Sequence, residues 1–211
     1  MATQERARAT RERIIVGAAE TFDRRGFATA SLADIAAAAG VTKGALYFHF
    51  SSKDELASAV IEAQHAAAAR SAAGMVVTNE DALETAVAIS AGLARSLQSD
   101  PLTRAGIRLT TESSAFDAPV RGPYEHWLAT FEAILVAALA AGDLRAGSDP
   151  AMLARFIIPS FTGIQIISEV FTARADLPER LAEMWGIVFR AAVPPERLER
   201  ALAMVERHLR R

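Results

Sequence analysis

The chain of 211 residues contains no cysteine, so it has neither a disulfide framework nor a thiolate that could act as nucleophile or metal ligand. It also lacks an HExxH motif, a glycine-rich phosphate loop and a Gly-x-Ser-x-Gly elbow, which argues against the enzyme classes that use them. Alternation of apolar and polar residues, the pattern of half-buried strands, is scarce. These absences favour a helical binding protein over an enzyme.

Signals for export or membrane insertion are missing as well. The first residues, MATQERARATRERI, are too highly charged for a signal peptide. Arg155 and Glu169 flank the most apolar run, so no uninterrupted stretch of about 20 apolar residues is present. We therefore expect a cytoplasmic protein that does not interact with a membrane.

Positive charge is unevenly distributed, although the formal net charge is only −2. Residues 1–53 contain eight Lys and Arg against five Asp and Glu, whereas the rest of the chain contains 15 basic and 20 acidic residues. A basic N-terminal end on an acidic body suits a protein that binds a polyanion with that end. An uneven scatter of charges by chance explains the numbers about equally well.

Helical periodicity runs through nearly the whole sequence. We expect an all-α fold of about ten helices, with a three-helix helix-turn-helix DNA-binding domain at residues 1–53 and a larger helical ligand-binding and dimerisation domain at residues 54–211. Gly26 should end the first helix, and Asn79 should cap the fifth. Pro159 should kink the long helix that begins near Pro150.

Residues 31–53, SLADIAAAAGVTKGALYFHFSSK, form the most informative segment. They predict a short helix capped by Ser31, a turn at Gly40 and a second short helix capped by Thr42. The second helix should bury its apolar residues, which are Val41, Ala45, Leu46, Phe48 and Phe50. A short helix with a small, mixed basic and aromatic outer face suits the major groove of DNA, whose width admits one helix.

The N-terminal residues closely resemble the TetR family of transcriptional repressors. The positions that carry the resemblance are Ile14, Ala18, Phe22, Gly26, Thr29, Ile35, Ala36, Gly40, Val41, Gly44, Tyr47, Phe48, Phe50 and Lys53. The body resembles one branch, the γ-butyrolactone-type autoregulator receptors of actinobacteria, at residues 104–112, around Trp127, at 161–185 and at 193–198. The resemblance implies a homodimer on palindromic operator DNA near antibiotic genes, released by a small lactone or butenolide signal.

Several residues of the N-terminal domain are candidates for contacting DNA. The first amides of a helix and the hydroxyl of Thr42 suit a phosphate, and Lys43 suits a phosphate or a guanine edge. Gly44 leaves room for a close approach. The predicted DNA-binding residues are Arg6, Thr42, Lys43, Gly44, Tyr47, His49 and Lys53. In the competing interpretation, Tyr47 is a core aromatic and Lys43 a solvated charge.

The resemblance to the receptor branch implies that Trp127 faces the ligand. Its ring could stack on a lactone while the indole N–H donates to a carbonyl. Gln64 and Thr162 could supply polar contacts. The predicted apolar walls of the pocket are Leu83, Val87, Leu109, Ile134, Ile158 and Phe161. In the alternative, Trp127 fills the core and Thr162 bonds to its own helix backbone.

Dimerisation is expected to use the helix after Asp149 and the helix around residues 181–189, packed with their copies as a four-helix bundle. The candidate interface residues, which could equally fill the core of one subunit, are Ile166, Ile167, Val170, Trp185, Val188 and Phe189. A ligand that shifts the long helix after residue 53 would change the separation of two DNA-binding heads.

Three other functions compete with this interpretation. Glu62 and His65 have the Glu-x-x-His spacing of di-iron bundles, but no second such pair occurs, so we expect no enzyme, metal or cofactor. A pseudo-receptor that has lost the natural ligand or responds to antibiotics would have much the same sequence. The third is a general TetR-type regulator of efflux with a broad apolar pocket.

Overall fold

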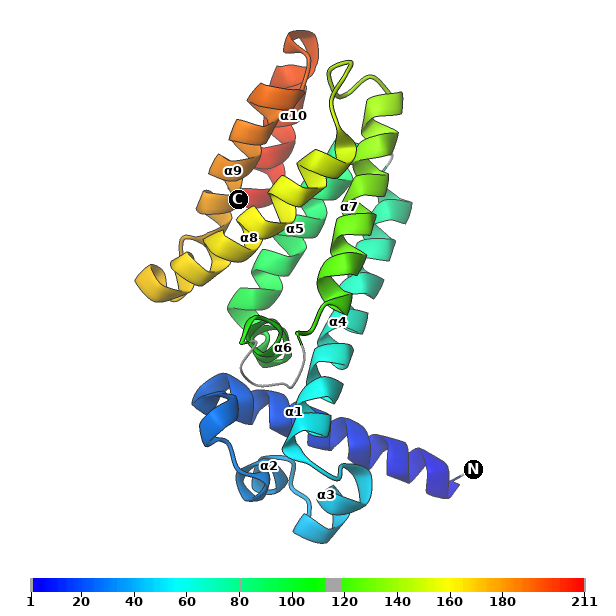
Figure 1. Cartoon of the computed structure of the whole chain (residues 1–211), viewed down its shortest axis with the longest axis vertical. Helices are drawn as coiled ribbons and strands as arrows, with labels where there is room; N and C mark the ends of the chain where they lie inside the picture. Colours follow the sequence, from blue (N-terminus) through cyan, green and yellow to red (C-terminus); the bar gives the residue numbers. More distant parts are fainter. Residues whose placement is uncertain (1, 80, 113–118, 211) are drawn as a thin grey trace. The chain divides into compact units, whose positions relative to one another are not determined.

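The computed structural model describes residues 2–79, 81–112 and 119–210, and within them the chain forms ten α-helices and no strand. The all-α prediction is therefore confirmed. The helices, labelled in Figure 1, are α1 (Ala2–Thr29), α2 (Leu32–Ala38), α3 (Lys43–His49), α4 (Lys53–Thr78), α5 (Ala82–Ser99), α6 (Pro101–Thr111), α7 (Gly122–Ala140), α8 (Pro150–Thr172), α9 (Leu177–Ala192) and α10 (Pro195–Leu209).

Local capping sets the start of several helices. At α2, Ser31 Oγ accepts from the Asp34 amide at 3.1 Å and the Asp34 carboxylate accepts from the Ser31 amide, which forms a capping box. The hydrogen bonds from Ser31, with Arg25 nearby, lower the pKa of the Asp34 carboxyl. Asp100 and Asp149 cap α6 and α8.

One predicted helix end is confirmed and one helix start is wrong. Gly26 has φ 75° and ψ 165°, so the regular helix that begins α1 ends there as predicted, and a short helical segment follows as far as Thr29. Asn79 does not cap α5, because α4 extends to Thr78 and the Asn79 amide still donates to the carbonyl of Met75. The cap of α5 is Asp81, whose carboxylate accepts from the amide of Glu84 at 3.0 Å.

By its internal contacts the chain divides into two units, which we call the head unit and the body unit. The head unit comprises Met1–Ala68 and Ser99–Val120, and the body unit comprises Ala69–Gln98 and Arg121–Arg211. The head unit therefore holds α6 as well as the three N-terminal helices, because α6 packs against α1. The boundary predicted after residue 53 separates a DNA-binding domain from a ligand-binding domain, whereas the two units are separated by their internal contacts, so the two divisions differ.

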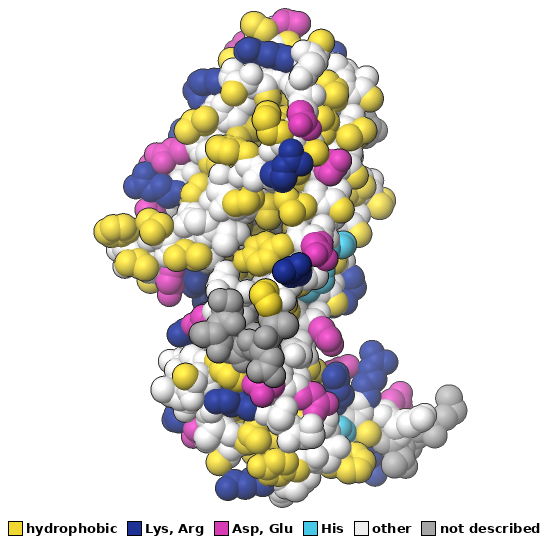
Figure 2. All heavy atoms as spheres, viewed as in Figure 1, with side chains coloured by type: hydrophobic (Ala, Val, Ile, Leu, Met, Phe, Trp, Pro, Cys, Tyr) yellow, Lys and Arg dark blue, Asp and Glu magenta, His cyan; other side chains and the backbone are white. Residues whose placement is uncertain are grey.

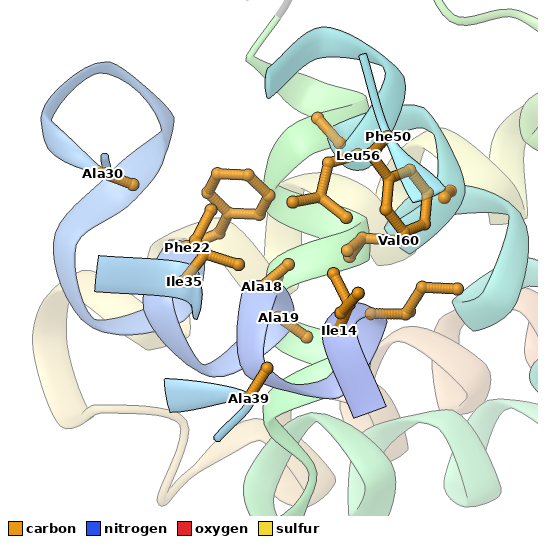
Figure 3. Packing of buried hydrophobic residues seen from close by; sticks show 14 of the residues in the cluster. Ile14, Ala18, Ala19, Phe22, Ala30, Ile35, Ala39, Phe50, Leu56 and Val60 are labelled. Atoms are coloured by element: carbon orange, nitrogen blue, oxygen red, sulfur yellow. The ribbon is translucent and has the colours of Figure 1, made fainter. Parts of the chain in front are cut away.

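The head unit has a hydrophobic core built from α1, α2, α3, α4 and α6. Figure 3 shows Phe22 of α1, Ile35 of α2, Phe50 at the end of α3 and Leu56 of α4 turned toward one another. All four side chains are buried. This packing holds α2 and α3 against α1, and so fixes the direction in which α3 points its outer face.

Phe48 is not part of this core, contrary to the prediction. Its side chain is 80% exposed, whereas Leu46 and Phe50 are buried. An α-helix turns about 100° per residue, so a residue two positions from both Leu46 and Phe50 lies on the opposite side. The short helix can bury only one side against the head.

In the body unit, α7 packs along α8, and α9 packs on both α8 and α10. The apolar residues of α9 fill this unit's interior, with Trp185 and Phe189 fully buried and their ring centroids 5.3 Å apart. Asp143 is buried after the end of α7 and is ion-paired with Arg197 of α10.

Helix α8 carries apolar residues on both sides. In the part of the chain described by the structure, it is the one helix long and apolar enough to cross a membrane, with mean hydropathy 1.4, although core helices of water-soluble proteins pass the same test. We call four of its exposed apolar residues, Ile166, Ile167, Val170 and Phe171, the α8 stripe. Figure 2 shows hydrophobic side chains along this end of α8. An exposed patch of this kind marks an interaction surface.

Candidate DNA-binding and ligand-binding sites

A helix cap, a glycine turn and a contact from α1 hold α3 in position. The Thr42 side-chain oxygen accepts from the amide of Ala45 at 3.1 Å. Gly40 has φ 61°, a conformation that strains residues with a Cβ, so glycine is needed at this turn. The guanidinium of Arg13 in α1 donates to the carbonyls of Ala39 and Gly40 at 3.0 and 2.7 Å. Together α2, the turn and α3 form a helix-turn-helix tied to α1.

The outer face of α3 is polar and aromatic. Thr42, Lys43, Gly44 and Tyr47 are exposed, and His49 is partly exposed. Tyr47 is 56% exposed, which excludes the interpretation that it is a core residue. A Cβ at Gly44 would meet only the Thr42 hydroxyl, at 4.0 Å, so packing within the head does not require glycine there.

Arg6 and Lys53 differ in their surroundings. Arg6 is exposed near the start of α1. The Lys53 ammonium donates to the carbonyls of Phe27, Ala28 and Ala30 at 2.8, 3.3 and 3.2 Å, and lies 4.4 Å from the centroid of the Phe27 ring. These bonds satisfy carbonyls at the end of α1 that have no partner within the helix. The phosphate contact predicted for Lys53 competes with this role and stays a prediction.

An ion pair joins α6 to α1 in the head unit. Arg104 donates from Nε and Nη2 to Oδ2 of Asp23, at 3.0 and 2.8 Å. Both side chains are mostly buried, so water screens the pair less than it would an exposed one. The two residues are 81 positions apart, and sequence analysis missed their pairing.

The candidate ligand site of the body unit centres on Trp127 in α7. Trp127 is partly buried, and its ring centroid lies 6.5 Å from that of Phe131 in an edge-on arrangement. Tyr124, three residues earlier on the same helix, is partly buried and hydrogen-bonds to Thr162 of α8; burial raises the pKa of its phenol. Thr162 also donates to the carbonyl of Ile158 at 3.1 Å, as the alternative interpretation expected.

The remaining predicted ligand contacts fall in both units. The buried ones in the body unit are Leu83, Val87, Ile134 and Phe161, and Ile158 is partly buried there. Leu109 is 1% exposed and belongs to the core of the head unit. Gln64 is buried in the head unit, where its Cβ lies 2.5 Å from the position that a Cβ on Gly106 would take. Their contacts with a ligand stay predictions.

Sequence analysis missed two polar residues of the body unit. Tyr124 is one, and Gln165 of α8 is the other. Gln165 is 3% exposed, and its Oε1 accepts no hydrogen bond within the described ranges. A buried acceptor without a partner is rare in native proteins and points to a bound group. Tyr124 lies three residues before Trp127, and Gln165 lies three residues after Thr162. Residues at this spacing are neighbours on a helix surface, so the sequence could have indicated both of them.

The predicted dimer residues divide into two sets. Ile166, Ile167 and Val170 are exposed, and Phe171 extends their row along α8. Trp185, Val188 and Phe189 are buried within one subunit. They therefore fill its core, which is the alternative to an interface role that the sequence left open. No group of three or more metal-ligating side chains comes together within residues 2–79, 81–112 and 119–210.

A helix-turn-helix with an exposed basic and aromatic second helix, joined to an all-helical body, defines a bacterial DNA-binding regulator. The model for bacterial regulatory proteins of the tetR family matches residues 14–60, and the model for the tetracyclin repressor-like C-terminal domain matches residues 80–194. The second match spans more than half of the chain. The chain belongs to the TetR family, as the sequence resemblance indicated.

Individual relatives match this chain over more than nine-tenths of its length and support the family assignment. The A-factor receptor protein of Streptomyces griseus is 34% identical over 195 residues, which cover 92% of this chain and 68% of that protein. The crystal structure of an ArpA-like γ-butyrolactone receptor is 36% identical, has a TM-score of 0.82 and covers 97% of this chain and 98% of its own. CprB of Streptomyces coelicolor, solved with its operator sequence, is 35% identical with a TM-score of 0.83, covering 98% and 99%.

Proposed function

We propose that this TetR-family regulator is a homodimeric repressor that binds palindromic operator DNA in the cytoplasm and leaves it when a small γ-butyrolactone or butenolide signal binds. The observation that carries the proposal is the exposed face of α3, where Lys43, Gly44 and Tyr47 stand together on a capped helix. Likeness to a γ-butyrolactone receptor over nearly the whole chain supports the class of signal, and likeness to a structure described for control of antibiotic production by bacterial hormones supports control of antibiotic genes. The chain binds rather than catalyses in this proposal.

On the operator, α3 enters the major groove and neighbouring residues hold the phosphates. The amides at the start of α3 and the Thr42 hydroxyl bind a phosphate, while Lys43 binds a phosphate or a guanine edge. The other proposed contacts are Arg6, Gly44, Tyr47, His49 and Lys53. Because neutralised phosphates supply most of the affinity, binding should weaken steeply as salt rises.

A second copy of the chain covers the α8 stripe in the proposed dimer. The four exposed side chains are apolar and spaced as one helical face, so burial against an identical face removes them from water. Two heads then meet half-sites about 34–36 Å apart, or a multiple of that distance.

The signal binds in the body unit beside Trp127. The lactone ring stacks on the indole, whose N–H donates to the lactone carbonyl, and the unpaired Oε1 of Gln165 accepts from a ligand hydroxyl. Tyr124 and Thr162 provide further polar groups. A signal that binds the DNA-free arrangement more tightly than the DNA-bound one shifts the population toward the DNA-free arrangement, by an amount set by the difference between its two affinities. Helix α4 contributes residues to both units, so we propose that it carries the change from the ligand site to the DNA-binding site.

Fluorescence anisotropy on a duplex from upstream of the chain's own gene tests the proposal, with a synthetic acyl γ-butyrolactone as the signal. Wild-type protein should bind with a Kd of roughly 10⁻⁸ M or below and be released by the lactone. Trp127→Ala should bind DNA equally well but need at least about tenfold more lactone, because the stacking surface is lost. Val136→Ala changes an exposed residue of the same helix and should behave like wild type.

Each failure has a different meaning. A protein that binds no duplex even at low salt would refute the repressor function. Binding that no γ-butyrolactone or butenolide reverses would keep the repressor, refute the signal class and favour a pseudo-receptor or an efflux regulator. Release of Trp127→Ala at the wild-type lactone concentration would refute the pocket.

A further inference from the structure

Phe48 is an exposed aromatic residue that the fold of the head does not explain. It is 80% exposed, while the core is completed on the other side of α3 by Leu46 and Phe50. Its ring meets the imidazole of its neighbour His49 edge-on, with centroids 5.2 Å apart. Transfer of a phenyl ring out of water is favourable, so a partner that covers Phe48 would gain free energy from the contact.

The position of Phe48 along α3 indicates where that partner lies. Gly44 and Phe48 are four residues apart and share one helix face, as Lys43 and Tyr47 do beside them. Gly44 has no side chain, and a Cβ there would meet only the Thr42 hydroxyl, at 4.0 Å. A surface that approaches α3 closely at Gly44 therefore reaches the Phe48 ring one turn later.

We propose that Phe48 contacts the C5-methyl group of a thymine in the operator and so selects a T·A pair at one position of each half-site. This inference rests on the proposed repressor function and deepens it. A phenyl ring has no donor or acceptor, so it cannot pair with the polar edge of any base. Thymine is the one base that presents a methyl group in the major groove, and apolar side chains recognise it there.

Deoxyuridine tests this contact directly, because it pairs like thymidine and lacks only the methyl group. Each thymine of the operator duplex is replaced in turn, symmetrically in both half-sites, and the Kd is measured by anisotropy. Burial of one methyl group corresponds to about a fourfold change in affinity, so loss of both should weaken wild-type binding about 15-fold at the contacted position.

Phe48→Ala provides the second half of the test. It should bind the unmodified operator at least about tenfold more weakly and lose all sensitivity to deoxyuridine at that position, because the two changes remove the same contact. Its thermal unfolding should match wild type, since the ring packs against no core residue. Val16→Ala removes apolar surface from an exposed position of α1 and should retain the wild-type deoxyuridine profile.

Two results would overturn the inference and leave the repressor function standing. In the first, wild-type protein binds the operator but no deoxyuridine substitution weakens it. In the second, Phe48→Ala keeps the wild-type sensitivity at the same position, which would assign the methyl contact to another residue. Failure of wild-type protein to bind any duplex would overturn the repressor function as well.

Discussion

Gly17 of α1 lies directly against Ala39, the residue that follows α2 in the head unit. A Cβ built at Gly17 would lie 2.6 Å from the backbone nitrogen of Ala39 and 2.9 Å from its Cα and Cβ. The carbonyls of Ala39 and Gly40 are in turn held by Arg13. The atoms that a new methyl group would displace are therefore backbone atoms with little freedom to move.

Two opposing effects decide the result of Gly17→Ala. Alanine favours a helix over glycine by about 1 kcal/mol, whereas overpacking a well-packed site costs about 1–3 kcal/mol. The contact is with backbone, so the cost should lie toward the upper end, which leaves a net loss of about 1–2 kcal/mol. Because α2 must shift, α3 should also move relative to α1, and operator affinity should fall.

Urea unfolding followed by circular dichroism measures the loss of stability, and anisotropy measures the operator affinity. Gly74→Ala is the matched control, because it lies in α4 and its new Cβ would meet no atom within 4 Å. This control should gain about 0.5–1 kcal/mol from helix propensity alone. If Gly17→Ala is stabilised as much as Gly74→Ala, the close approach of α1 and α2 is not a constraint and the reasoning fails.

Three further outcomes are expected. Asp23→Asn should lower the free energy of unfolding by about 1–2 kcal/mol in urea titrations, because the group that accepts from Arg104 loses its charge, whereas an unchanged midpoint would mean that the pair contributes nothing. Lys53→Met should lower the thermal midpoint, because three carbonyls lose their donor, and should reduce the slope of log Kd against log salt by about one; an unchanged slope would refute the proposed phosphate contact of Lys53. Hydrogen bonds from Ser168 and Thr172, with Arg180 nearby, lower the pKa of Asp176 to about 2, so its stabilising effect is present above its unfolded value of 3.8 and is lost as the pH falls toward 2. The stability difference between wild type and Asp176→Asn should therefore disappear across that interval in acid unfolding curves, and a constant difference would contradict the assignment.

Residues close in sequence determined most of the helices. The caps at Ser31, Thr42 and Asp100 depend on an amide two or three residues away, so they could be read directly from the sequence. The outward direction of Lys43 and Tyr47 follows from the helical period in the same way. The local signal failed at Asn79, because α4 extends to Thr78 and takes up the Asn79 amide, so that Asn79 cannot begin the next helix.

Tertiary structure decided which side of each helix is covered. The helical period places Phe48 and Phe50 on opposite sides of α3, but only the packing of the head decides which of the two is buried. Local sequence does not indicate that the Lys53 ammonium donates to carbonyls 23 to 26 residues away, because only the fold brings those residues together. The pairing of Tyr124 with Thr162 joins two helices. Such partners are brought together by burial of distant apolar faces, which no local pattern encodes.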